Sequence, residues 1–322
     1  MGFKVRNEVV AEKTAMRDAF CQTLIELAKK DDRICLLDAD LMGAMGTKPF
    51  AKELPERTVD CGIQEANMVG VACGLSMTGK IPFLHSFAPF ITRRAHDQIF
   101  ISGCYSGANI RLVGSDPGVM AAYNGGTHMP FEDVALYSTI PGSTIIDVTD
   151  PAMLQSVLGQ CVKRPGVKYI RVGRKKYARV YADGTELPIG KAVTLKEGRD
   201  LVIFAAGIMV HEAMQAAKKL EQEGISAAVV DCFTIKPLDR ETVVRWAKET
   251  GAVVVAENHN RYGGLCASVA QTLAEEAPVP CEFVAVEDRF GQVGPQDYLQ
   301  EAYGLTADHV AEQARTVLRR KG

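Results

Sequence analysis

Residues 58–76 read Thr-Val-Asp-Cys-Gly-Ile-Gln-Glu-Ala-Asn-Met-Val-Gly-Val-Ala-Cys-Gly-Leu-Ser, which places an acid, Glu65, at the start of a predicted helix. Gly70 and Gly74 lie inside that helix, and each glycine weakens a helix interior by about 1 kcal/mol relative to alanine. Two such costs in one helix indicate that something approaches its backbone closely. Two rings, Phe87 and Phe90, follow downstream. An acid near stacking-capable rings and a thin helix is typical of a cofactor site.

The composition places the chain among globular proteins with ordinary surfaces. Its 322 residues suffice for two domains, with 47% hydrophobic and 24% charged residues. A net charge of −2 argues against a nucleic-acid binder. No stretch is as apolar as a membrane span, and the first residues lack the apolar centre of a signal peptide. The nine cysteines form no Cys-x-x-Cys pair, so we expect a reduced, cytoplasmic protein.

The first half of the chain alternates apolar strands with helices. Strands are expected at 34–38, 81–84, 109–114, 144–148 and 168–172, and helices at 65–77, 92–102, 131–138 and 151–162. Continuous apolar strands separated by helices predict a mainly parallel sheet covered on both faces.

A second alternation of the same kind follows a charged stretch without clear period at 174–189. Its strands are expected at 201–205, 227–231, 252–256 and 282–286, and its helices at 210–223, 240–249, 263–275 and 307–319. The sequence therefore predicts an α/β protein of two doubly wound domains, at 1–175 and 191–322, with a linker at 176–190.

Three groups of residues could carry chemistry, and each has a plainer reading. Glu65 could cap a surface helix, or it could donate a hydrogen bond to a ring nitrogen when buried beside one. Phe87 and Phe90 could form a stacking wall or simply pack in a core. His128 follows two glycines in Asn-Gly-Gly-Thr-His, so it either faces a pocket or has a structural role in a turn.

Taken in order, these motifs resemble the transketolase family of thiamine-diphosphate enzymes. The resemblance rests on Cys-Gly-Ile-Gln-Glu, Phe-Ala-Pro-Phe-Ile-Thr-Arg-Arg-Ala-His-Asp-Gln and Gly-Gly-Thr-His-x-x-x-Glu-Asp. Residues 254–269, beginning Val-Val-Ala-Glu-Asn-His-Asn, are similar to the C-terminal domain of that family. The match covers nearly the whole chain. It implies a pyrimidine-binding fold followed by a transketolase C-terminal domain.

The resemblance also implies a role for each candidate residue. Glu65 matches the glutamate that hydrogen-bonds the aminopyrimidine ring of thiamine and favours the tautomer that takes up a proton. His128 matches the histidine that faces substrate and shuttles protons. The residues implied to hold the pyrimidine ring are Phe87, Phe90, Asp40 and Leu41. In such enzymes the cofactor supplies the organic chemistry, and the protein supplies tautomer control and positioning.

One half of the family pattern is missing from this sequence. The diphosphate-binding half carries Gly-Asp-Gly and a later Asn that together hold a divalent metal, and no Gly-Asp-Gly occurs here. We therefore expect no metal ligands in this chain. A second polypeptide, the N-terminal transketolase subunit, is expected to bind the diphosphate and Mg²⁺, in a heterotetramer with two copies of each chain.

The substrate positions depart from the common family pattern. Asn124 stands where sugar-phosphate transketolases usually have Asp, and the phosphate-binding His and Ser are replaced at 114–118 and near Ala44. Arg174 matches the phosphate-binding arginine and suits a bidentate contact, although it could also be a solvated linker cation. An atypical ketose phosphate is the expected donor.

These features favour ketol transfer, in which a two-carbon unit passes from a ketose to an aldehyde. A β subunit of a 2-oxo-acid dehydrogenase is an alternative, but the Thr-His-x-x-x-Glu-Asp segment favours transketolase. A non-catalytic assembly subunit is a further alternative, and the retained Glu65 and His128 argue against it. A NAD-binding fold is set aside because Phe-Ala-Ala-Gly-Ile at 204–208 has one glycine where the fingerprint needs three.

Overall fold

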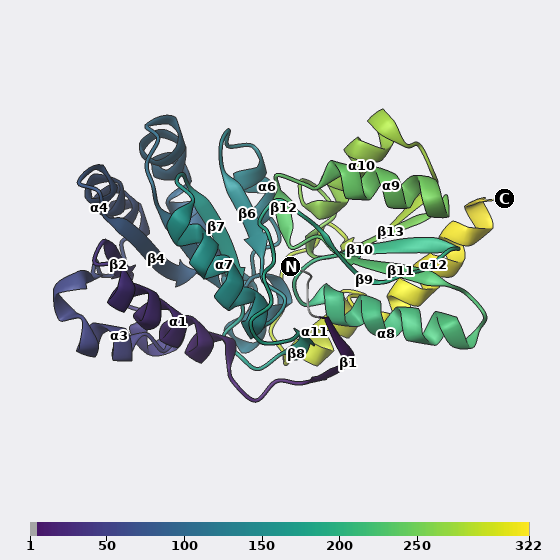
Figure 1. Cartoon of the computed structure of the whole chain (residues 1–322), viewed down its shortest axis with the longest axis horizontal. Coiled ribbons are helices and arrows are strands. Elements are labelled where there is room, and N and C mark those ends of the chain that lie inside the picture. Colours follow the sequence, from purple (N-terminus) through teal and green to yellow (C-terminus); the bar gives the residue numbers. More distant parts are fainter. Residues whose placement is uncertain (1–4, 322) are drawn as a thin grey trace.

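The computed structural model describes residues 5–321, which form two α/β lobes lying side by side (Figure 1). The first lobe is built on a seven-stranded sheet of order β12-β6-β7-β5-β4-β2-β3, and only β12 is antiparallel to its neighbour. Its strands are β2 (Ile34–Asp38), β3 (Thr58–Asp60), β4 (Ile81–Phe87), β5 (Arg111–Ser115), β6 (Thr144–Asp147), β7 (Lys168–Val172) and β12 (Thr234–Lys236).

The second lobe is built on a five-stranded sheet of order β14-β13-β10-β11-β9, in which only β9 is antiparallel. Its strands are β9 (Val193–Lys196), β10 (Leu201–Ala205), β11 (Ala227–Asp231), β13 (Val253–Asn260) and β14 (Cys281–Val286). Strands β1 (Val5–Ala11) and β8 (Ala178–Tyr181) form a separate antiparallel ladder.

Helices and helical turns connect these strands and cover the sheets. Those of the first lobe are α1 (Met16–Lys30), α2 (Met42–Met45), α3 (Lys48–Glu53), η1 (Pro55–Arg57), α4 (Glu65–Met77), η2 (Phe90–Arg94), α5 (His96–Gln98), η3 (Ile99–Tyr105), η4 (Gly118–Asn124), η5 (Gly126–His128), α6 (Asp133–Ser138) and α7 (Pro151–Lys163). Those of the second are α8 (Met209–Gln222), α9 (Arg240–Thr250), α10 (Leu265–Glu276), α11 (Gln296–Ala302) and α12 (Ala307–Lys321).

The predicted α/β fold with mainly parallel sheets is confirmed, and α4 has the predicted bounds. The central strands β4, β5 and β7 are buried along their whole length, as parallel strands covered on both faces should be. Helix α7 begins where the sequence indicates, because Asp150 caps it by accepting from the Met153 amide and Pro151 occupies its first turn.

Beyond the expected elements, the structure has β1 and α1 before residue 34. Two local expectations are wrong. The stretch at 174–189 contains β8, which is ordered by pairing with the distant β1. The single helix expected at 92–102 is instead two π-type turns around the short α5, and β4 extends to Phe87, so that ring lies within the strand.

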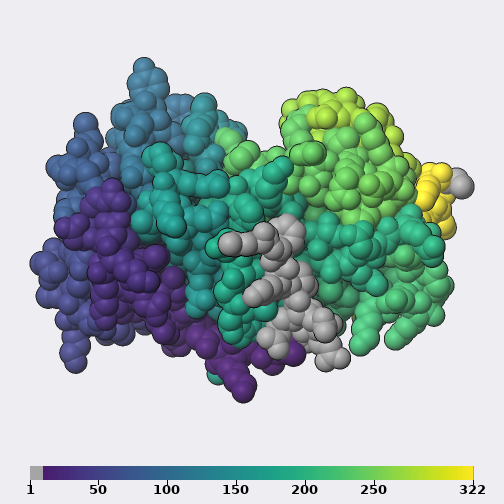
Figure 2. All heavy atoms as spheres, viewed as in Figure 1, coloured from purple at the N-terminus to yellow at the C-terminus, as the bar shows by residue number. Residues whose placement is uncertain are grey.

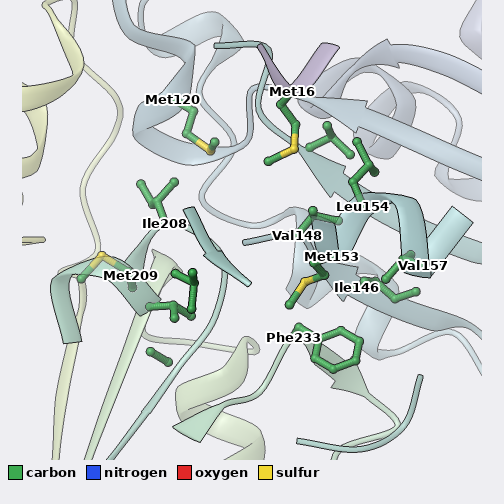
Figure 3. Packing of buried hydrophobic residues seen from close by; sticks show 14 of the residues in the cluster. Met16, Met120, Ile146, Val148, Met153, Leu154, Val157, Ile208, Met209 and Phe233 are labelled. Carbon is green, nitrogen blue, oxygen red and sulfur yellow. The ribbon is translucent and has the colours of Figure 1, made fainter. Parts of the chain in front are cut away.

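Two clusters of buried hydrophobic side chains each include residues of both lobes. Figure 3 shows side chains of one of these clusters, with Met120 and Met153 from the first lobe and Ile208, Met209 and Phe233 from the second. Strand β12 belongs to the second half of the chain but pairs with β6 at the edge of the first sheet. The lobes therefore share a core and a sheet, and the space-filling view shows them in broad contact below a notch (Figure 2).

A buried ionic cluster adds to this contact. Arg171 on β7 donates to Asp133 Oδ2 at 2.8 Å, to Asp147 Oδ2 at 2.5 Å and to the Asn258 carbonyl oxygen at 2.9 Å. Asn258 lies on β13, so this arginine joins the two sheets. No helix among residues 5–321 is both long enough and apolar enough to cross a membrane.

Candidate active site

Most of the predicted site residues lie where parallel strands of the first sheet end. Phe87 is the last residue of β4, Asp40 and Leu41 form the turn after β2, and Asp116 directly follows β5. Ligands of open parallel sheets bind at the carboxyl ends of the strands, because loops from neighbouring strands converge there. The topology therefore gathers at one edge residues that are far apart in the sequence.

Glu65 is the first residue of α4, and its side chain is almost completely buried, at 2% exposure. Ser86 Oγ donates to Glu65 Oε1 at 2.8 Å, and Arg94 Nη1 donates to Glu65 Oε2 at 3.2 Å. Because Glu65 is buried and bonds to Ser86 and Arg94, the interpretation of Glu65 as a surface helix cap is wrong. Both carboxyl oxygens of Glu65 are thus engaged by side chains from the β4–η2 segment.

Three rings pack beside this acid. The Phe87 and Phe90 centroids are 6.2 Å apart, and the His128 ring lies 5.4 Å from Phe87 and 4.9 Å from Phe90, all in edge-to-face geometry. The Arg94 guanidinium stands over the Phe90 ring, with its carbon 4.0 Å from the centroid. Arg94 thus touches both Glu65 and Phe90, which joins the acid to the ring cluster.

His128 ends the η5 turn and is only partly exposed. Its Nδ1 lies 2.9 Å from Thr127 Oγ1. Burial, followed by the positive charges of Arg94, Arg174 and Arg93, lowers the pKa of His128. The imidazole is therefore neutral over more of the pH range than an ordinary histidine, and a neutral imidazole can accept a proton.

The Asp40–Leu41 turn is held by a buried network that the sequence pattern does not reveal. The Asp40 amide donates to Asp60 Oδ1 at 3.1 Å, and Asp40 itself has a positive φ of 60°. Asp38 accepts from the Leu41 amide with one oxygen and pairs with His85 Nδ1 at 2.8 Å with the other. His85 Nε2 in turn lies 3.0 Å from Ser115 Oγ, so three strand ends are tied together.

A signal for this network and for the Glu65 partner does exist in the sequence. His85 and Ser86 interrupt the otherwise apolar run of β4, and a buried polar side chain must have a partner. Nothing local in the sequence identifies those partners, because Asp38 and Glu65 lie on other elements.

Arg174 forms an ion pair with Asp116 rather than lying free in a linker. Its Nε donates to Asp116 Oδ2 at 2.6 Å, its amide donates to Asp116 Oδ1 at 3.0 Å, and its guanidinium carbon is 4.8 Å from the Phe87 centroid. The reading of Arg174 as a solvated cation is therefore wrong. Burial raises the pKa of Asp116 although Arg174 opposes that shift, and Asp116 has a strained φ of 52°.

Asn124 lies apart from the ring cluster, exposed at the end of η4 in the same loop as His128. The predicted residues Glu65, Phe87, Phe90, His128 and Arg174 are joined to one another through ring contacts and Arg94. The structure therefore brings together five of the predicted side chains and leaves Asn124 exposed in the loop that carries His128.

The thin surface of α4 is open in the structure. Outside the helix, no described atom comes within 4 Å of a Cβ built at Gly70 or Gly74. The close approach expected from these glycines is therefore not made by residues 5–321 of this chain. Among the same residues, no cluster of three or more His, Cys, Asp or Glu side chains is arranged to hold a metal ion.

Comparison with known proteins identifies the family. Residues 12–179 match the transketolase pyrimidine-binding domain, and residues 190–310 match the transketolase C-terminal domain. The chain belongs to the transketolase family. The resemblance inferred from the sequence motifs is thereby confirmed, and this family uses thiamine diphosphate.

Similar transketolase subunits cover nearly the full chain. A 6-deoxy-6-sulfo-D-fructose transketolase subunit of Clostridium sp. (strain MSTE9) is 48% identical over 98% of both chains. An apulose-4-phosphate transketolase subunit of Phocaeicola vulgatus is 37% identical over 93% of this chain and 96% of that one. A solved split gene transketolase, an inactive beta4 tetramer, superposes with a TM-score of 0.89 at 40% identity, covering 97% of this chain and 100% of that one.

These relatives are two transketolase subunits and a split gene transketolase, and the chain is a transferase of the same family. Its reaction is the transfer of a two-carbon ketol unit from a ketose to an aldehyde. The alternatives of a 2-oxo-acid dehydrogenase β subunit and of a non-catalytic assembly subunit are not favoured by the same comparisons.

Proposed function

We propose that this transketolase subunit supplies the pyrimidine half of a shared active site, with Glu65 as its central acid. The supporting observation is the position of Glu65, which is buried at the N-terminus of α4 and is joined through Arg94 to the ring cluster of Phe87, Phe90 and His128. The proposed extents are 1–175 for the pyrimidine-binding domain, 176–190 for the linker and 191–322 for the C-terminal domain.

The residues of this chain fit one end of thiamine diphosphate. A flat pyrimidine ring suits the aromatic wall of Phe87 and Phe90 beside the Asp40–Leu41 turn. When bound, the cofactor supplies the carbon nucleophile that cleaves the ketose beside its carbonyl. The diphosphate end needs a divalent cation with several oxygen ligands, and residues 5–321 offer no such cluster. We therefore assign the diphosphate and Mg²⁺ to the partner subunit.

Within this half-site, Glu65 is the residue that hydrogen-bonds a ring nitrogen of the cofactor. Ser86 and Arg94 each bond one oxygen of the Glu65 carboxyl group. Ser86 fixes one carboxylate oxygen, whereas Arg94, whose side chain is 49% exposed, can swing away from the other. That oxygen is then free to hydrogen-bond a ring nitrogen. His128, kept neutral by its surroundings, accepts or returns a proton at the substrate.

The partner is proposed to dock on the open face of α4. This helix lies at the outer end of the first lobe (Figure 1), and its glycines leave room for close contact. Exposed apolar side chains surround it, namely Ile63, Met77 and Ile101. An apolar rim around a thin helix suits a protein interface. The proposed assembly contains two copies of each chain and works in the cytoplasm.

The donor is proposed to be a ketose with an anionic end held by Arg174. Because Asp116 already neutralises much of the Arg174 charge, a monoanion should be repelled less than a dianion. This favours a sulfonate over a phosphate, with Asn124 and His128 at the sugar hydroxyls. A panel of 6-deoxy-6-sulfo-D-fructose, fructose 6-phosphate and fructose tests this choice. Asp116→Asn should raise kcat/KM for the phosphate relative to the sulfonate, and an unchanged ratio would contradict the argument.

The central experiment is reconstitution with the N-terminal subunit, thiamine diphosphate and Mg²⁺. Glu65→Gln keeps the side-chain shape and should lower kcat by about 10²–10⁴-fold, the usual contribution of a positioned proton-transfer group. Glu56→Gln, at an exposed acid nine residues earlier in the sequence, is the matched control and should not change kcat. Wild-type kcat in the Glu65→Gln complex would refute the proposed role.

A further inference from the structure

The loop between β5 and α6, residues 117–131, contacts the second lobe at both of its ends and in its middle. This loop carries Asn124 and His128, the two residues proposed to meet the sugar. Its backbone is irregular, with positive φ at Gly118, Ala122 and Gly125. A strained segment of this kind keeps its shape only where its surroundings determine it.

Asn258 of β13 fixes the start of the loop. Its side chain is 1% exposed, donates from Nδ2 to the Pro117 carbonyl at 3.0 Å and accepts from the Val119 amide at 3.0 Å. Both polar ends of the amide are therefore engaged by the loop backbone. A Cβ built at Gly118 would overlap the Asn258 amide, so the two segments are in direct contact.

The position of Asn258 is itself fixed from the first lobe. Its carbonyl oxygen accepts from Arg171 Nη2 at 2.9 Å. Two residues further along the same strand, the Asn260 amide donates to the Phe131 carbonyl at 2.9 Å. One strand of the second lobe therefore holds both ends of the substrate loop.

The middle of the loop is pressed by a second segment, residues 287–294, which follows β14. A Cβ built at Gly126 would lie 2.5 Å from the Gly291 carbonyl oxygen, and one built at Gly291 would lie 2.8 Å from Gly126 Cα. A Cβ built at Gly125 would lie 2.7 Å from Val293 Cγ2. The turn that ends in His128 has no room to move toward the second lobe.

A cavity of 550 Å³ lies where these segments meet. Its walls come from both lobes and include Arg93 and Glu132 from the first and Arg289 and Phe290 from the second. Arg93 also donates to the Thr127 carbonyl at 3.4 Å, next to His128. The second lobe thus forms part of the wall beside the substrate loop.

We propose that the C-terminal domain sets the position of His128 for catalysis, with Asn258 and Gly291 as positioning residues. The domain then contributes to the substrate site of this enzyme in addition to its shared core with the first lobe. The catalytic part of this inference rests on the proposed role of the loop in substrate binding. The mechanical part, that the second lobe holds the loop, can be tested separately.

The test uses Asn258→Ala and Gly291→Ala in the reconstituted complex. The first removes two loop bonds, and the second pushes a methyl group against Gly126. Val269→Ala, at a buried position of α10, is the control for general destabilisation. Hydrogen–deuterium exchange of residues 118–130 reports loop order without any assay of activity. Kinetics use whichever donor of the proposed panel reacts fastest.

Both loop variants should exchange at least tenfold faster at 118–130 and lose at least tenfold in kcat/KM for the donor. Their affinity for thiamine diphosphate should stay within twofold of wild type, and Val269→Ala should show neither effect. Unchanged exchange in both variants would overturn the proposed hold on the loop. Faster exchange with unchanged kcat/KM would show that the contacts from the second lobe do not matter for catalysis, and would also overturn the proposed substrate role of the loop. If no donor reacts even with the wild-type complex, the proposed function is wrong. The hydrogen–deuterium exchange measurement then still tests whether the second lobe holds the loop.

Discussion

Replacing Arg171 by leucine should destabilise the protein more than any surface substitution. The guanidinium is 1% exposed and donates to Asp133, Asp147 and the Asn258 carbonyl, so the change leaves two carboxylates buried without their cation. Removing one partner of a buried ion pair costs about 3–5 kcal/mol. At about 2 °C per kcal/mol for a chain of this size, the Tm should fall by about 6–10 °C.

The effect should also depend on pH. Burial raises the pKa of Asp147, and loss of Arg171 would raise it further. A carboxyl group whose folded pKa exceeds its unfolded value contributes stability below the unfolded pKa and loses it as pH rises. The Tm difference between wild type and Arg171→Leu should therefore be larger at pH 8 than at pH 5.5, because proton uptake by Asp147 relieves the buried charge at lower pH.

Calorimetry of the isolated chain measures both effects. Arg240→Leu is the matched control, since Arg240 pairs with Glu275 and Glu276 on the surface, where ion pairs contribute little. Its Tm should stay at the wild-type value. Adding Asp133→Asn and Asp147→Asn to Arg171→Leu should recover part of the loss. Equal Tm values for Arg171→Leu and Arg240→Leu would refute the reasoning.

Three further predictions use other sites. Of the nearby positive charges, that of Arg94 lowers the pKa of His128 the most. Arg94→Gln should therefore move the midpoint of an NMR titration of His128 to higher pH, and an unchanged or lower midpoint would contradict this. Burial raises the pKa of Asp231 to about 8, so the wild-type free energy of unfolding should fall as pH rises from about 4 to 8. In urea unfolding, the free energy of unfolding of Asp231→Asn should depend less on pH than that of the wild type. The same pH dependence in both proteins would contradict this. Gly74→Leu should leave the isolated chain folded but prevent its co-purification with the partner, whereas normal assembly would show that the partner docks elsewhere.

The parts of the fold that local pattern determines could be read from the sequence. The parallel core strands are continuous apolar runs, α4 has the bounds predicted for it, and the acid at position 65 lies where the motif indicates. Strand β8 could not be predicted, because its charged sequence becomes a strand only by pairing with β1. The π-type turns at 90–105 also escape prediction, since their wider spacing departs from the helical period that sequence patterns reveal.

The same distinction applies to the candidate site. Glu65 and the Phe87–Phe90 pair are visible in one continuous stretch of sequence. The partners that orient them are not, because Arg94 reaches Glu65 only through a π-type turn and Asp38 meets His85 only across neighbouring strands. Arg174 is identifiable from its motif, but its pairing with Asp116 depends on the ends of two strands meeting at one edge.

Strand β12 comes from the second half of the chain but belongs to the first sheet, so the two lobes cannot be separated at the linker without removing a strand from that sheet. The first sheet is completed by Thr234–Lys236, so a fragment ending at the linker would leave β6 as an unpaired edge that can recruit other chains. A chimaera with the C-terminal domain of a relative would need to bring a compatible β12, including the Lys236 amine that donates to the Ser138 and Ile140 carbonyls. The two domains are thus not interchangeable modules, and their sequences have to change together in evolution.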